Sequence, residues 1–270
     1  MASGEAVPPR MGSREEKRAF LLRDIALPPI AVPGIPVVAG MATMPSRAVS
    51  FQFAFASIVR QVDKLYLYLD GHEEVPPVVR GHANVEVVFS RDHPGLHANG
   101  KLLGLTLERR ECIYLCVDDD IYFPRHFVAS MRHGLEQERD RAVVGLHGIR
   151  LARPLVRFFT DQVLVSHYAF PLAHATEVDL VGTGAAMFSS AVLKFDVADW
   201  PRVSMADIGL AMEAARRGLS MVSIARPGPL IVNLAEGQAD SLYLARLKDD
   251  SRQTEFAKQL LSLRGEIAPG

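Results

Sequence analysis

The chain has 270 residues, 49% of them hydrophobic, and a net charge of −1. This is enough apolar material for one large α/β domain, with or without an extension. A charge so near zero argues against nucleic acid or an anionic membrane as a general partner, and no apolar run is long enough to span a bilayer. The P-loop, GxGxxG, GxSxG and HExxH motifs do not occur, which argues against P-loop ATPases, common dehydrogenases, esterases and zinc proteases.

The chain has two cysteines, Cys112 and Cys116. Four residues apart on an extended strand, their Cα atoms would lie about 13 Å from each other, too far for a disulfide. We therefore expect two small core residues in a reducing compartment. The first residues also lack the apolar core of a signal peptide, so the expected location is the cytoplasm, including a peripheral position at the inner face of a membrane.

Residues 1–34 have the composition of an extension. Ser13, with Glu16 three residues later, predicts a short capped helix over residues 13–23, and the prolines of residues 27–34 predict an extended linker. The helix has two expected packing sites, the main domain or a second subunit, and a partly disordered tail is the alternative.

Strand-like and helix-like segments alternate through the first half. Strands are expected at residues 35–42, 64–70, 84–90 and 112–117, and helices at residues 50–61 and 101–110. This order predicts a mixed, mainly parallel sheet with helices on both faces. Because the carboxyl ends of parallel strands share one edge, we expect the polar residues that follow each strand to line one cleft. These are Arg47, Asp70, the 91–101 loop and the aspartates at 118–120.

The second half is less regular. Helices are expected at residues 124–138, 208–217 and 241–263, and strands at residues 141–146, 162–168, 178–188 and 219–225. Gly182 and Gly184 predict an interruption of the third of these strands. The predicted organisation is an extension (1–34), a domain (35–235) and a C-terminal helical segment (236–270). That last helix is expected to pack on the domain, pair with another subunit or lie near a membrane, although its mixed charge is unlike a membrane-docking face.

Three aspartates, Asp118, Asp119 and Asp120, follow the strand at 112–117 directly, and Pro124 prevents the strand from continuing. Side-chain alternation places Asp118 and Asp120 on one side and Asp119 on the other. Two carboxylates about 5 Å apart repel by roughly 3 kcal/mol at an effective dielectric of 20, which favours a bound cation. Carboxylate oxygens suit Mg²⁺ or Mn²⁺ better than zinc, and such ions commonly hold substrate phosphates. The plain alternative is an acidic turn that caps the next helix.

These features come in a characteristic order. A strand runs into the turn at residues 43–47, Asp70 ends the second strand, and Asn99-Gly100-Lys101 precedes a helix and the aspartate triplet. Over roughly residues 35–230 this order resembles the GT-A glycosyltransferases, especially family-2-like bacterial enzymes that build capsule, lipopolysaccharide or related glycans. The resemblance implies a GT-A-type, Rossmann-like α/β fold. It also implies metal-dependent transfer from a nucleotide-diphosphate sugar, with a UDP-sugar as first choice, to a glycan or lipid-linked acceptor with inversion.

The resemblance assigns roles to individual residues. Asp118 and Asp120 would be the ligands of Mn²⁺ or Mg²⁺, with Asp118 near the ribose, and Asp119 would help hold the donor sugar. The residues expected to contact the nucleotide are Thr43, Pro45, Arg47, Asp70, Asn99, Gly100, Lys101, Asp118 and Asp119. For Arg47 and Lys101 the alternative is a solvated cation at a helix end.

The expected catalytic base is Asp207, although Ser204 three residues earlier makes a capping box with no chemistry the alternative. Ala206 stands where many relatives have glutamate, and no histidine follows His174 as a further metal ligand. The candidate substrate contacts are Gly182, Thr183, Gly184 and Trp200. For the two glycines the alternative is a simple bulge. Trp200 is a candidate for stacking on the acceptor, and its alternative is a position in the core. His93, His97 and His174 are expected to make ordinary polar contacts.

Two other functions stay open. A sugar-phosphate nucleotidyltransferase would use a similar sheet, but residues 41–47 lack the glycine-rich signature typical of that class. A non-catalytic nucleotide- or glycan-binding module is the other. No nucleic-acid partner is expected, and a homo-oligomer through the N- or C-terminal helix is a further hypothesis.

Overall fold

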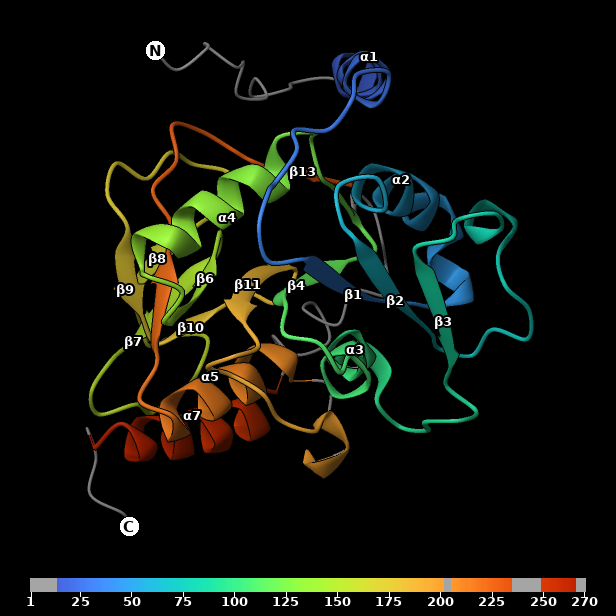
Figure 1. Ribbon diagram of the computed structural model, residues 1–270. Coiled ribbons are helices and arrows are strands. Elements are labelled where there is room, and N and C mark those ends of the chain that lie inside the picture. The colour runs from blue at the N-terminus through green and yellow to red at the C-terminus, as the bar shows by residue number, and fades with distance from the viewer. Residues whose placement is uncertain (1–13, 202–204, 235–248, 266–270) are drawn as a thin grey trace.

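The structure is a computed structural model that describes residues 14–201, 205–234 and 249–265 (Figure 1). Within these residues an eight-stranded sheet has the order β3-β2-β1-β4-β11-β6-β12-β9. Its strands are β1 (Val37–Thr43), β2 (Lys64–Leu69), β3 (Val85–Phe89), β4 (Ile113–Asp118), β6 (Ala142–Gly145), β9 (Thr176–Val178), β11 (Ala185–Ser189) and β12 (Ser220–Ser223). The first four are mutually parallel, β12 is parallel to β6, and β11 and β9 are antiparallel to their neighbours. The expected mixed, mainly parallel sheet is confirmed.

Helices cover both faces of the sheet (Figure 1). One face packs against α2 (Ala48–Ile58) and α4 (Phe127–Gln137). The other packs against α3 (Leu103–Leu107), α5 (Ala206–Arg216) and α7 (Ser251–Leu263). Strand β4 is buried on both faces because its side chains alternate between the two cores. Cys112 and Cys116 both point to the α3–α5 side, where they are buried and unbridged, as expected.

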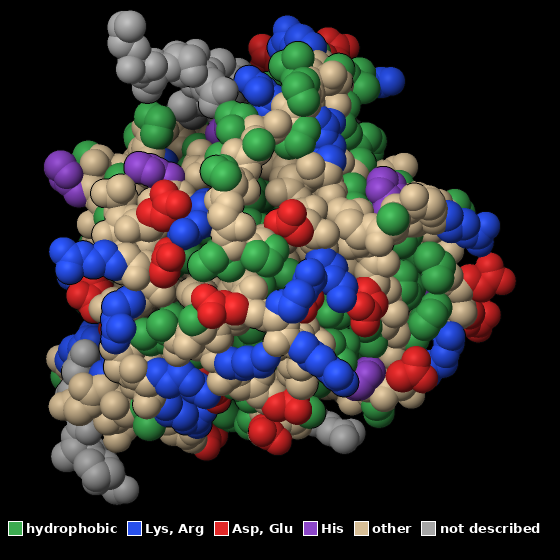
Figure 2. Space-filling model, viewed as in Figure 1, with side chains coloured by type: hydrophobic (Ala, Val, Ile, Leu, Met, Phe, Trp, Pro, Cys, Tyr) green, Lys and Arg blue, Asp and Glu red, His purple; other side chains and the backbone are tan. Residues whose placement is uncertain are grey.

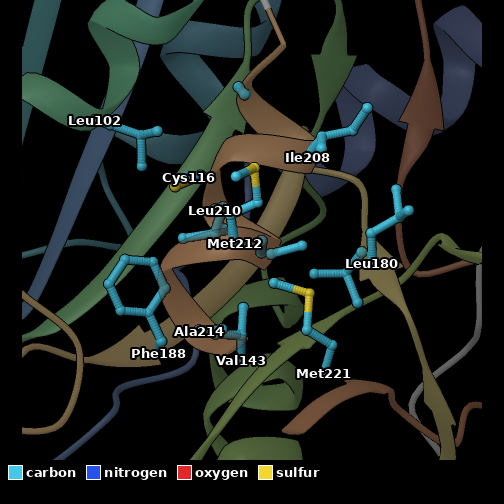
Figure 3. Packing of buried hydrophobic residues seen from close by; sticks show 14 of the residues in the cluster. Leu102, Cys116, Val143, Leu180, Phe188, Ile208, Leu210, Met212, Ala214 and Met221 are labelled. Carbon is cyan, nitrogen blue, oxygen red and sulfur yellow. The ribbon is translucent and has the colours of Figure 1, made fainter. Parts of the chain in front are cut away.

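Helix α5 is held in place by its packing. Figure 3 shows Leu210 and Ala214 of this helix beside Phe188 of β11 and Val143 of β6, and all four side chains are buried. Helix α7 adds Ala257, Leu260 and Leu261 to the same core. Of the predicted helix at 241–263, residues 241–248 lie outside the described part of the chain, and the described helix begins at Ser251.

The segment 178–188 is interrupted at Gly182 and Gly184, as expected, and it has a second break at Asp179 that the sequence does not predict. The chain forms β9, β10 (Leu180–Val181) and β11, and β10 belongs to a second sheet with β7 (Gly148–Leu151) and β8 (Gln162–Ser166). Asp179 breaks the run: its buried carboxylate accepts from the Leu151 backbone N–H at 2.7 Å and pairs with Arg153. These contacts hold Asp179 between the two sheets, so the chain leaves one sheet and enters the other at this residue.

The helix predicted at 101–110 is also shifted. The segment begins as the 3-10 helix η3 (His97–Leu102), and α3 ends at Leu107. Other short elements are η1 (Pro45–Arg47), η2 (Pro77–Val79), η4 (Val197–Asp199), and the two-stranded pair β5 (Ile121–Tyr122) and β13 (Val232–Asn233). Sequence periodicity does not reveal elements this short.

Helix α1 (Arg14–Ile25) packs on the body of the protein rather than standing apart from it. The Tyr122 hydroxyl donates to the Asp24 carboxylate at 2.9 Å, and the Phe20 ring meets the edge of Tyr122. Among the described residues, no helix is both long and apolar enough to cross a membrane.

Candidate functional site

A cavity of about 1060 Å³ opens where β1, β2 and β4 reach their carboxyl ends. The structure brings most of the expected site residues to its walls. They are Thr43, Arg47, Asp70, Lys101, Asp118, Asp119, Asp120, Gly182, Thr183, Gly184 and Asp207. Over the face seen in Figure 2, acidic and basic side chains are interspersed, in keeping with the near-zero net charge. The charged lining of the cavity is therefore a local feature. It depends on which strand ends meet at this edge of the sheet.

Lys101 is the most deeply buried cation of the site, with 4% of its surface exposed, and its ammonium pairs with the Asp118 carboxylate. Close backbone packing puts it there. A Cβ at Gly40 of β1 would overlap the Lys101 carbonyl oxygen, and one at Gly100 would overlap the Tyr68 ring. Two glycines thus let η3 lie directly on the sheet.

The charge of Lys101 is fixed by its surroundings. Burial acts to lower the pKa of its ammonium, but the Asp118 carboxylate and the more distant Asp207 outweigh burial and raise that pKa. Lys101 is therefore a permanent cation beside Asp118. The alternative of a solvated helix-end cation does not hold for it.

The aspartate triplet does not follow simple strand alternation. Only Asp118 belongs to β4; Asp119 and Asp120 form a turn into β5, so all three carboxylates line the cavity. The expectation that Asp119 faces away is wrong, because alternation ends where the strand ends. An Arg47 guanidinium nitrogen lies 3.7 Å from the Asp120 carboxylate.

Two of these carboxyls have raised pKa values. Burial, aided by the neighbouring Asp120 and Asp118, raises the pKa of Asp119 to about 7. Burial and then the charge of Asp118 raise the pKa of Asp120 to about 6, although Arg47 and Lys101 oppose this. Burial is the main cause of both shifts and the neighbouring carboxylates add to it, so a bound cation that stabilises the ionised forms is favoured here.

The donor set fits a hard divalent cation that is shared with a substrate. Carboxylate oxygens suit Mg²⁺ or Mn²⁺, and Lys101 already engages one oxygen of Asp118. In the described part of the chain no three His, Cys, Asp or Glu side chains form a ready metal cage. Magnesium-like ions usually bind through one or two carboxylates plus phosphates and water, which this site can accommodate.

Asp207 is the second residue of α5, and its side chain turns into the cavity. The backbone N–H and the hydroxyl of Thr183 both donate to its Oδ1, at 2.8 and 2.6 Å. The N-terminal end of a helix also favours a carboxylate. Ser204 of the alternative capping box lies outside the described residues; Met205 is the N-cap and has no side-chain capping bond. Asp207 is therefore held by the loop at 182–184.

This loop joins the parts of the site. A Cβ at Gly184 would lie 2.5 Å from Oδ2 of Asp118, so only glycine leaves room for that carboxylate. At the other end, the Gly182 N–H donates to the His147 carbonyl at 2.8 Å. Three consecutive residues thus contact Asp118, Asp207 and His147, which makes the glycines more than a simple bulge.

Four expected site residues do not line the cavity among the residues described: Pro45, Asn99, Gly100 and Trp200. Trp200 stacks on Phe195, with ring centroids 5.1 Å apart, and lies against Gly209 of α5. Its half-buried ring packs against the core, which favours its alternative core position, and the described cavity lining does not include it. Gly100 packs on Tyr68 and Asn99 is buried in η3; both place Lys101 instead of lining the cavity.

Sequence reasoning missed a group of aromatic residues on the cavity wall. His147 and His167 meet edge to face at 5.3 Å, His167 stacks on Tyr168 at 4.3 Å, and Asn233 donates to the Tyr168 hydroxyl. Burial lowers the pKa values of both histidines, so they are neutral at pH 7. His147, His167 and Tyr168 lie in the turns just after the short strands β6 and β8, where no periodic signal marks them.

His97 has a more specific place than the ordinary polar contact expected for it. Its Nδ1 lies 3.0 Å from Oδ2 of Asp70, and both residues line the cavity. Its backbone φ of +49° is uncommon outside glycine. This constrained backbone points the imidazole at Asp70.

Comparison with known proteins supports the fold. No protein-family model matches the sequence, and no curated protein matches it significantly. Among solved structures, the chain is similar to the mannosyltransferase PcManGT from Pyrobaculum calidifontis in complex with GDP-Man and Mn²⁺. The TM-score is 0.53 at 17% identity, over 92% of this chain and 75% of the other. At this identity the likeness shows a shared fold, and it confirms the GT-A-type α/β fold expected from the sequence.

Proposed function

We propose that this protein is a metal-dependent glycosyltransferase that moves a sugar from a nucleotide-diphosphate sugar to an acceptor hydroxyl with inversion. One observation carries the proposal: the aspartate cluster with Lys101 and the loop-held Asp207 share a single cavity at the carboxyl edge of the sheet. That edge is where ligands bind in α/β folds. The order of the motifs resembles that of enzymes of bacterial surface polysaccharide synthesis, which is the proposed setting.

Different charged groups bind different parts of the donor. Asp70, positioned by His97, lies at the end of β2 for the ribose or base. Lys101 and Arg47 supply fixed positive charge beside the carboxylates for the diphosphate. Mn²⁺ or Mg²⁺, held by Asp120 and Asp118, would neutralise charge on the leaving diphosphate, which is commonly the largest electrostatic contribution in such reactions.

Asp207 acts at the acceptor. Its carboxylate removes the proton from the acceptor hydroxyl as that oxygen attacks the anomeric carbon. The bond from that carbon to the diphosphate breaks, and the nucleoside diphosphate leaves with the electron pair. One displacement inverts the anomeric configuration. Thr183 fixes Oδ1, and Oδ2 accepts no hydrogen bond from the described residues and stays available for the proton.

A panel of UDP- and GDP-sugars with Mn²⁺ tests the proposal by release of nucleoside diphosphate. UDP-sugars are the first choice from the motif resemblance, and GDP-mannose is included because the similar mannosyltransferase binds it. Asp120→Asn is expected to lower release at least 100-fold. Asp92→Asn, an exposed aspartate on the neighbouring loop, is the matched control and should have no effect.

Three results would contradict the proposal. Full activity of Asp120→Asn would show that Asp120 is not a metal ligand. Production of pyrophosphate from a nucleoside triphosphate and a sugar phosphate would identify a nucleotidyltransferase instead. Tight nucleotide binding with no sugar transfer to any acceptor would identify a non-catalytic binding module.

A further inference from the structure

The cavity has a second half that the charged residues do not use. Apolar side chains line it: Ile149 of β7, Phe158, Phe159, Val165 of β8 and Leu180 of β10. The total of about 1060 Å³ exceeds the roughly 300–1,000 Å³ of a usual single-ligand pocket. A cavity of this size can hold a donor together with part of an acceptor, and the wall of its second half has a different chemistry.

This apolar wall is a built surface. The Phe158 backbone N–H donates to the Thr254 hydroxyl at 3.0 Å, and the Phe159 N–H donates to the Asp250 carboxylate at 3.1 Å. The two rings meet edge to face, with centroids 5.2 Å apart. The start of α7 thus anchors both phenylalanines.

Val165 stands out on this wall because 44% of its surface is exposed, although it lines a cavity. Two residues away on the same strand, Val163 is 64% exposed and lies outside the cavity lining. Single exposed valines need no explanation. An exposed valine that lines the same cavity as two anchored phenylalanines extends the apolar lining toward solvent.

Asp207 lies at the junction of the two halves. The loop that binds it lies against Asp118 on the charged side through Gly184, and the Gly182 N–H donates to the His147 carbonyl on the other. Gly182 and Leu180 carry the chain from the Asp207-binding loop to the apolar wall. A hydroxyl within reach of Asp207 would therefore have its remaining substituents next to apolar side chains.

We propose that the acceptor carries an apolar group, an alkyl chain or an aryl ring, close to the hydroxyl that receives the sugar, and that this group binds against Phe158, Phe159 and Val165. The reacting hydroxyl rests on the proposed transferase function. The apolar contact is separate and is measurable without turnover. A purely polar oligosaccharide would leave this wall unmatched.

Binding of methyl, phenyl and octyl β-glycosides of one sugar, each below its micelle concentration, tests this by calorimetry on the full chain with UDP and Mn²⁺ and without them. The phenyl or the octyl glycoside is expected to bind at least tenfold more tightly than the methyl glycoside, because burial of two or three methylenes gives about that factor. A preference for octyl identifies an alkyl source, and a preference for phenyl an aryl one.

The matched variants are Val165→Asp on the wall and Val163→Asp outside it. Both place a carboxylate on an exposed position of β8, so their cost to the strand is similar. Val165→Asp should weaken apolar-glycoside binding about tenfold, and Val163→Asp less than twofold. If thermal unfolding shows that Val165→Asp does not fold, Val165→Thr keeps the shape and should show a smaller loss in the same direction.

The results separate this inference from the proposed function. Equal binding of all three glycosides, or equal losses in the two aspartate variants, overturns the apolar subsite even if sugar transfer is observed. Binding that depends on Val165 while no sugar nucleotide is turned over supports the subsite and overturns the transferase. Faster transfer to the apolar glycoside, lost in Val165→Asp, supports both.

Discussion

The two halves of the cavity are built from two kinds of backbone. The charged half lies at the ends of β1, β2 and β4, three neighbouring parallel strands whose carboxyl ends meet at one edge whatever their side chains. The apolar half is made by β7, β8, β10 and the turn at Phe158, which are short and join an antiparallel sheet. Topology alone places residues in the first half, whereas only tertiary pairing places them in the second.

The two halves also differ in electrostatics. In the charged half Lys101 pairs with Asp118, Arg47 lies near Asp120, and His97 contacts Asp70. In the apolar half the titratable side chains His147 and His167 are neutral, because burial lowers their pKa values. Asp207 joins the two halves, so variants that separate its role from that of the charged half test the comparison most strongly.

The largest effect is expected for Asp207→Asn. Loss of a general base lowers the rate of transfer about 10²–10⁴-fold, while affinity for nucleoside diphosphate stays the same because the donor groups lie in the other half. Steady-state rates and calorimetric nucleotide binding measure the two effects separately. Asp199→Asn, an exposed aspartate shortly before α5, is the control. Equal loss of nucleotide affinity and rate would show that Asp207 belongs to the donor half.

Lys101→Met tests the charged half as a structural unit. Lys101 is buried, but the side chain of Asp118 is 38% exposed, so water partly solvates the carboxylate that loses its partner, and we expect a loss of about 1–3 kcal/mol in the free energy of unfolding. Arg80→Met is the control, because Arg80 and Glu74 form a pair that is 64% and 86% exposed; its cost should be below about 1 kcal/mol. Urea denaturation measures both. Similar losses in the two variants would contradict the buried pair.

Asp119→Asn tests the burial of this carboxyl, in metal-free protein. The pKa of Asp119 is raised from 3.8 to about 7. The folded state therefore binds more protons between these values, and this carboxyl lowers stability as pH rises from 4 to 7. The asparagine side chain cannot ionise, so the variant should be about 1–3 kcal/mol more stable than the wild type at pH 8 and about equal to it at pH 4. Asp92→Asn should show no such pH dependence; a difference that is the same at both pH values would refute the assignment.

Much of the charged half follows from the sequence. Lys101, Asp118 and Asp70 were placed by the rule that parallel strands end at one edge, and the structure has them on one cavity wall. Asp119 was misplaced because the rule of alternation was carried one residue beyond the end of β4. The error concerns a single residue, but it determines how many carboxylates face the cavity.

The apolar half was out of reach of the same reasoning. Asp179 moves the chain from one sheet to another through a buried pair with Arg153, a contact 26 residues away that no local pattern encodes. A prediction that misses this change of sheet cannot bring His147, Phe158 and Val165 to the same cavity as Asp207. Trp200 is the only tryptophan and lies close to Asp207 in sequence, yet its ring packs on Phe195 and Gly209. Closeness in sequence does not determine which side of a helix a neighbour occupies.

The smallest effect is expected for Thr183→Val, which keeps the backbone bond to Asp207 and removes the one from the hydroxyl. Loss of a hydrogen bond to a charged group of about 1.5 kcal/mol corresponds to roughly a tenfold lower kcat. Thr183→Ser keeps the hydroxyl and should recover most of the rate. Because Thr183 contacts the junction rather than either half, KM for the donor and affinity for apolar glycosides should both stay within twofold of the wild type. A change in KM of the same size as that in kcat would show that the loop orders the donor site rather than the base.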